Sequence, residues 1–92
     1  MTRETICAEL RRLDFGCQAA EIEAATTPDA ECAALEYALS FISGYRRALD
    51  RHARALQHTS AGSEAKEIDR LEDEIVKRHA VLSADRLRRT GT

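Results

Sequence analysis

The stretch TTPDAECAALEYALSFISGYRRAL, residues 26–49, decides the fold class. It holds the one proline of the sequence, Pro28, at a place where Thr26 or Thr27 can cap a helix and acidic residues follow in the first turn. Beyond Pro28 the sequence has no further proline and one glycine, in Ser43-Gly44, until the Ser- and Gly-containing segment at residues 59–63. The stretch therefore predicts a long central helix over about residues 28–58.

Two further helices follow from the flanking segments, whose apolar residues recur every three or four positions. They are expected at about residues 2–25 and 63–89, the second of them capped by Ser63, with residues 90–92 as a frayed tail. No segment alternates apolar and polar residues in the manner of a strand. The expected fold class is all-α: one helical domain spanning residues 1–92, built as an elongated up-down-up array of three helices.

The central helix has an apolar arc of roughly 200° at 100° per residue, about twice the width that one neighbour covers. It must therefore contact two elements, of which residues 63–89 supply one and residues 2–25 or a second chain the other. The predicted charge pattern fits an antiparallel arrangement, because the basic second half of the central helix would lie beside the acidic first half of the last one. The same pattern suits an antiparallel dimer, and we expect a homodimer.

Composition bounds the function. A net charge of −2, from 16 acidic and 14 basic residues, gives the whole chain no attraction to phosphate or to an anionic membrane. The first fifteen residues interleave charged and apolar side chains, unlike a signal peptide, and no segment has the length of a membrane span. Three cysteines without CxxC spacing do not form a secreted disulfide framework. The expected location is the cytoplasm.

The sequence predicts no metal, cofactor or catalytic site. The cysteines and histidines lack the spacings of known zinc motifs, and the expected helix pairing keeps them apart. Cys17, with Cys32 as a second candidate, is expected to be a buried apolar thiol rather than a nucleophile. No glycine-rich phosphate loop or GxSxG motif is present. We therefore expect a protein that is not an enzyme.

Phe15 and Ile22 lie seven positions apart on the side of the first predicted helix opposite its main apolar stripe. In a straight three-helix array they would stand in water, as an exposed surface for a partner or a second copy. Alternatively, Gly16 breaks that helix and turns both side chains into the fold. Both placements stay open at the level of sequence.

Gly44 is the unexpected residue of the central helix, since glycine inside a helix costs about 1 kcal/mol relative to alanine. It lies near Ser40 and Ala48 on a strip of small residues that borders Tyr37 and Phe41. The hypothesis is that Gly44 lets another helix approach closely while the aromatic rings pack around the crossing. The alternative is a slight bend at Ser43-Gly44.

Arg47, Arg51, Arg54 and His58 form a basic stripe along the same helix. The stripe is either a solvated face, a grip on an acidic protein partner, or a contact to phosphates. The function we favour is a small helical protein-binding module, an adaptor, regulator or inhibitor of a host protein, of the kind that a bacteriophage or mobile element encodes. Its expected partner-binding residues are Phe15, Ile22, Tyr37, Phe41, Gly44, Arg47, Arg51 and Arg54. The alternative is a nucleic-acid-binding regulator that uses the Arg stripe of a dimer.

Overall fold

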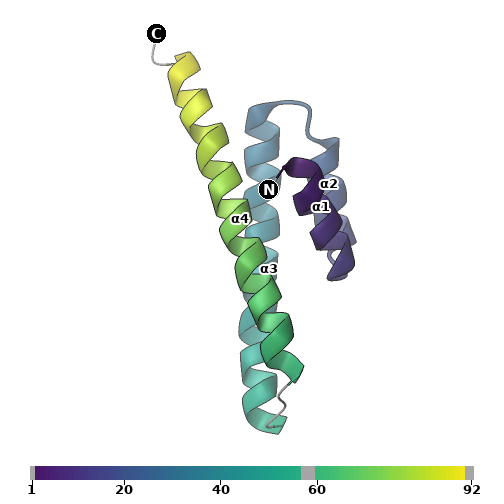
Figure 1. The fold of residues 1–92 in the computed structure, drawn as a ribbon. Helices are drawn as coiled ribbons and strands as arrows, with labels where there is room; N and C mark the ends of the chain where they lie inside the picture. The colour runs from purple at the N-terminus through teal and green to yellow at the C-terminus, as the bar shows by residue number, and fades with distance from the viewer. Residues whose placement is uncertain (1, 57–59, 91–92) are drawn as a thin grey trace.

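The computed structural model describes residues 2–56 and 60–90, and all the regular structure within these two ranges is helical. Four helices follow one another along the chain: α1 (Arg3–Arg12), α2 (Gly16–Ala24), α3 (Pro28–Leu56) and α4 (Ser60–Thr90). Figure 1 shows a long hairpin of α3 and α4, with a short hairpin of α1 and α2 packed against the half of α3 nearer its beginning. The all-α class is therefore confirmed.

The start of α3 is the predicted one. Pro28 occupies the first helical position, and the hydroxyl of Thr27 accepts a hydrogen bond of 3.1 Å from the backbone N–H of Ala30. Helix α4 begins at Ser60, three residues before the predicted Ser63. The predicted last residues of the central helix, 57 and 58, and the end of the predicted tail, 91–92, lie outside the described residues.

The expected continuous helix over residues 2–25 is two helices in the structure. Asp14 has a left-handed φ of 69°, and the N–H groups of Asp14 and Phe15 donate to the carbonyls of Arg11 and Leu10. This is the Schellman arrangement that ends many helices, with aspartate where glycine is usual. Gly16 has no positive φ and is the first residue of α2. The break therefore occurs at Asp14, and Gly16 lies immediately after it.

The break has a physical reason in the two apolar stripes of residues 2–25. A straight helix would have buried only one of them. The turn at residues 13–15 folds α2 back beside α1, so that Ile6 and Leu10 of α1 share one buried face with Ile22 of α2. In exchange, the second half of the predicted main stripe is left in contact with solvent: Cys17, Ala20 and Ala24 are exposed. The expectation of a buried Cys17 was therefore wrong, whereas Cys32 is buried as proposed.

The core lies between the two hairpins. Its members are Ile6, Cys7, Leu10, Phe15, Ala19, Ile22, Ala34, Leu35, Ala38, Ile42, Ile68, Leu71 and Ile75. All four helices contribute, and the molecule measures 54 × 22 × 18 Å. The expected three-helix up-down-up array is not confirmed, because its first helix is itself a hairpin.

A buried carboxylate ties the four helices together at the end where α3 begins. The Glu31 side chain is 7% exposed and receives hydrogen bonds from Arg78 of α4, at 2.6 and 3.3 Å, and from Arg3 of α1, at 3.3 Å. Arg3 also donates to the carbonyl oxygens of Glu23 and Ala25 at the end of α2, each at 3.1 Å. Burial alone would raise the pKa of Glu31, but the two guanidinium groups outweigh it and the pKa is lowered.

The opposite end of the long hairpin has the predicted charge pairing. Arg46 of α3 donates to Asp69 of α4 at 3.0 Å and also pairs with Asp50 one turn further along α3. The two aspartates are half exposed or more, so each pair contributes little to the free energy of folding. They do show that α3 and α4 run antiparallel, since residues late in α3 lie beside residues early in α4.

Candidate protein interface on the outer face of α3

The structure separates the predicted partner-binding residues into two groups. Phe15 and Ile22 are buried in the core of the chain itself, at 4% and 0% exposure. Of the two placements open for them, the single chain has the inward one. The second group lies on the side of α3 that faces away from α4 and from the short hairpin: Tyr37, Phe41, Gly44, Arg47 and Arg51. The side chain of Arg54 and all of His58 lie outside the part of the chain that the structure describes.

Phe15 has a different role from the predicted one, because it supports the exposed rings from beneath. Its ring meets Phe41 edge to face, with centroids 5.9 Å apart, and Tyr45 in the same manner at 5.3 Å. Edge-to-face pairs of this kind add stability beyond the area that they bury. Phe41 is nevertheless 50% exposed. Its ring is therefore held in place on one side and open to solvent on the other.

Tyr45 is also fixed at its polar end. Its hydroxyl donates to the carboxylate of Glu64 on α4 at 2.8 Å, and the pKa of Tyr45 is raised, first by this hydrogen bond and then by burial. The ring thus spans from the core contact with Phe15 to the surface of α4. Two of the three aromatic residues on this side of α3 therefore have a defined orientation before any partner binds, which lowers the entropic cost of association.

Around these rings the surface is hollowed. One open concavity of about 470 Å³ is lined by Tyr37, Ser40, Phe41, Gly44 and Tyr45. A second, of about 460 Å³, is lined by Glu21 of α2 and by Ala30, Ala33, Ala34 and Tyr37 of α3. Because Tyr37 borders both, they form one shallow groove along α3 with the exposed side of α2 at its edge. Apart from Glu21 its lining is uncharged, and most of it is small or aromatic.

Gly44 lines the part of this groove farther from α2, and the fold gives no reason for a glycine there. A Cβ atom placed on Gly44 would meet nothing within 4 Å, and its φ is not positive. Neither close packing within the chain nor an unusual backbone conformation requires it. The open space above Gly44 is what a second helix would need in order to approach α3 closely.

We define the outer seam of α3 as the exposed or half-exposed residues that repeat at alternating steps of three and four along it. The members are Ala30, Ala33, Tyr37, Ser40, Gly44, Arg47 and Arg51. This spacing is the heptad pattern by which one helix packs along another. Sequence reasoning found Tyr37 and Gly44 as separate features, and the regular spacing was the signal that could have joined them into one seam.

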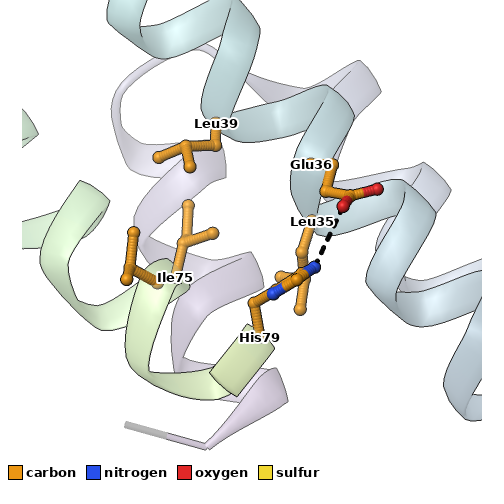
Figure 2. A pocket seen from close by; sticks show the side chains of 6 residues that line it. Leu35, Glu36, Leu39, Ile75 and His79 are labelled. Atoms are coloured by element: carbon orange, nitrogen blue, oxygen red, sulfur yellow. Dashed lines mark hydrogen bonds and ion pairs between the residues drawn. The ribbon is translucent and has the colours of Figure 1, made fainter. Parts of the chain in front are cut away.

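A second groove lies on the far side of the long hairpin, opposite the short one (Figure 2). Its volume is about 290 Å³, and Leu35, Glu36 and Leu39 of α3 face Ile75, Val76 and His79 of α4 across it. His79 Nε2 lies 3.1 Å from a carboxylate oxygen of Glu36, and His79 Nδ1 lies 3.4 Å from the hydroxyl of Ser83.

This order of serine, histidine and carboxylate is that of a hydrolase triad, but the surroundings differ from those of a hydrolase. A serine nucleophile also needs N–H donors aimed at the oxyanion that its attack creates. Ser83 lies inside α4, where the backbone N–H groups bond to carbonyls of the preceding turn. We therefore assign the three residues to a partly exposed hydrogen-bond chain between α3 and α4.

The Cys7 thiol is not placed to act as a nucleophile either. Cys7 is fully buried and its Sγ lies 3.7 Å from the carbonyl oxygen of Ala19, to which it donates. Burial, followed by the charge of Glu23, raises the pKa of Cys7, which keeps the thiol protonated. In residues 2–56 and 60–90, no three His, Cys, Asp or Glu side chains are grouped closely enough to hold a metal ion.

No described helix combines the length and apolar composition that crossing a bilayer requires. Comparison of the sequence with protein-family models gave no match, and comparisons with curated proteins and with solved structures gave none either. The outer face of α3, with its supported rings, groove and unexplained glycine, is therefore the feature from which a function has to be argued.

Proposed function

We propose that the chain is a non-enzymatic protein-binding module that presents the outer face of α3 to a helix of another protein molecule. One observation carries the proposal: Phe41 is half exposed although Phe15 holds it firmly from beneath. An aromatic ring that is oriented in advance and open on one face is an anchor of the type that supplies much of the affinity at protein interfaces.

The rest of the face suits the same role. The groove between α2 and α3 has the form into which an amphipathic helix packs, with Tyr37 and Phe41 as anchors along one side. Arg47 and Arg51 are exposed at the end of the seam, where they add complementarity to an acidic segment of a partner. Adaptors, regulators and inhibitors all work through such a surface, and the expected homodimer would use it as well.

A capture experiment tests the proposal. The chain, immobilised through its C-terminus, is exposed to lysate of its host in three forms: unchanged, with Tyr37→Ala and Phe41→Ala together, and with Val81→Ala. Val81 is 59% exposed on α4 and serves as the matched control. We expect a protein that is bound by the unchanged chain and by the control, and lost from the double variant.

Capture of the same protein by all three forms would contradict the role of the α3 face. The nucleic-acid alternative predicts a different result: binding of DNA or RNA that weakens steeply with salt and is lost in Arg47→Glu with Arg51→Glu. Circular dichroism of each variant shows that a lost interaction is not a lost fold.

A further inference from the structure

The outer seam of α3 is complementary to itself when a second copy is laid along it in the opposite direction. Its middle holds two small residues, Ser40 and Gly44, and its two halves differ in charge. Arg47 and Arg51 lie in the second half of α3, whereas Glu36 borders the first half and is 67% exposed. A symmetric dimer requires this property, because each contact across a two-fold axis occurs twice with the roles exchanged.

In one antiparallel register, the residues that face each other fit from Ala33 to Arg51 of the seam. With Ser40 opposite Gly44 of the second copy, the two backbones can approach closely, since nothing within the chain occupies the space above Gly44. The same register places Tyr37 opposite the second copy's Arg47, a pairing of aromatic ring and guanidinium that is itself attractive. It also places Ala33 opposite Arg51, so that a small residue meets a long one.

The two flanks of the seam agree with this register. On the flank nearer α2, the two half-exposed Phe41 rings meet close to the two-fold axis, each supported by its own Phe15. On the other flank, Glu36 lies beside the second copy's Arg47 twice over. A parallel pairing would set Arg47 against Arg47 and Arg51 against Arg51, which like-charge repulsion and the parallel helix dipoles disfavour.

We infer, on the basis of the proposed protein-binding role of this face, that its occupant is a second copy of the same chain, docked antiparallel along α3 with its two-fold axis beside Phe41. Helix α3 of each copy then lies between its own two neighbours and α3 of the other copy. The wide apolar arc of α3 requires a neighbour besides α4. In the dimer it has two, the short hairpin of its own chain and α3 of the second copy.

Sedimentation equilibrium at micromolar concentration tests the dimer and its register. Glu36→Arg and Arg47→Glu should each weaken self-association by about tenfold or more, and the two together should restore it to within about threefold, because the reversed charges again face each other. Lys77→Glu reverses a charge on the exposed side of α4. It is the matched control and should leave self-association unchanged. Gly44→Leu should abolish the dimer, since the close approach is blocked.

Cross-linking tests the direction of the helices independently of stability. In a Cys17→Ser background, a mixture of Ala33→Cys chains and Arg51→Cys chains should form disulfides mainly between the two kinds of chain, because the register places these two exposed positions opposite each other and leaves Gly44 unchanged. A parallel dimer would instead form disulfides between identical chains, and that result would overturn the inference.

Three other outcomes also overturn it. A chain that is monomeric at these concentrations but loses a captured protein on Tyr37→Ala with Phe41→Ala would show that the face binds a different partner, and the proposed function would stand without the dimer. A dimer that none of these variants weakens would show that the copies meet on another surface. A monomer that captures nothing would contradict both the dimer and the proposed protein-binding function.

Discussion

At the scale of single residues, Asp14 is the most constrained backbone position among the described residues. It is the one residue there, apart from glycines, with a positive φ, and its left-handed conformation ends α1 and turns the chain toward α2. Aspartate tolerates this region better than most residues, but glycine adopts it without the steric cost of a Cβ atom. The position therefore carries strain that a substitution can remove.

Asp14→Gly should raise the free energy of unfolding by about 0.5 to 1 kcal/mol, because the turn is kept and the strain of the left-handed backbone is relieved. Asp14→Ala should lower it by a similar amount, since alanine has the Cβ atom but lacks the side-chain polarity that favours this conformation. Urea denaturation of the three proteins measures both changes. Equal effects of the two substitutions would show that the backbone conformation is not the cause.

Glu31 is a buried charged residue at the meeting point of the helices. Its carboxylate is buried between Arg3 and Arg78, and its pKa in the folded chain lies below the ordinary value of 4.5. A group with a lowered folded-state pKa contributes stability that is present above its unfolded-state pKa and is lost as the pH falls through the folded-state value. The contribution of Glu31 should therefore be complete at neutral pH and disappear in acid, below about pH 4.5.

Glu31→Gln should lower the free energy of unfolding by about 3 kcal/mol near neutral pH, because two partly buried guanidinium groups lose the charge that compensates them. The difference between the variant and the unchanged protein should shrink as the pH falls below 4.5, since glutamine does not titrate. Denaturation curves at neutral and acidic pH give this difference directly. A gap that stays constant with pH would mean that shape, not charge, sets the contribution of Glu31.

At the scale of elements, α3 contains a conflict between its own stability and its outer face. Every other requirement of a long helix is met: a cap at Thr27, proline at the first position and an apolar side that packs against α4 and the short hairpin. Gly44 lowers helix stability in the middle of this element without serving any contact inside the chain. In the proposed role of the outer face, the close approach of another helix would offset this cost.

Gly44→Ala should therefore have effects of opposite sign on folding and on association. At concentrations low enough to keep the chain monomeric, the free energy of unfolding should rise by about 1 kcal/mol, because the new methyl group meets no neighbour. Self-association should weaken at the same time, because the added Cβ atom separates the two α3 backbones. Thermal denaturation at low concentration and sedimentation at higher concentration measure the two effects separately, and a gain in both would contradict the close-approach role.

At the scale of the whole molecule, the short hairpin of α1 and α2 does what a third long helix was expected to do. It covers the apolar side of the long hairpin and brings Phe15 beneath Phe41 and Tyr45. The core and the candidate interface thus share one aromatic cluster. Phe15 lies on the core side of this cluster and Phe41 on the solvent side, so substitutions of the two residues should separate stability from binding.

Phe15→Ala should lower the free energy of unfolding by about 3 to 5 kcal/mol, because it leaves a cavity where the short hairpin meets the long one. Phe41→Ala should cost much less, since half of its ring is exposed in the single chain, yet it should reduce association strongly. Urea denaturation and sedimentation of both variants give the comparison. If Phe41→Ala were as destabilising as Phe15→Ala, the ring of Phe41 would belong to the core rather than to an interface.

The beginning of α3 was predictable because its determinants are local: a threonine cap, a proline at the first position and acids in the first turn act within a few residues. The break at Asp14 was not, because neither proline nor a left-handed glycine marks it. The turn forms there because folding residues 2–25 back on themselves buries the larger apolar side chains of both stripes, Ile6 and Leu10 from one and Phe15 and Ile22 from the other. Gly16 was the nearby signal, two residues after the position that adopts the left-handed conformation.

By itself the sequence determined the helical class, the long hairpin of α3 and α4 with its opposed charges, and the oddity of Gly44, since periodicity, capping and composition are properties of neighbouring residues. Only the tertiary structure decided that Phe15 and Ile22 face inward, that Cys17 faces outward, and that Glu31 joins Arg3 and Arg78. Which of two apolar stripes is buried depends on the total area removed from water across segments far apart in the chain. That quantity exists only once the two hairpins have packed together.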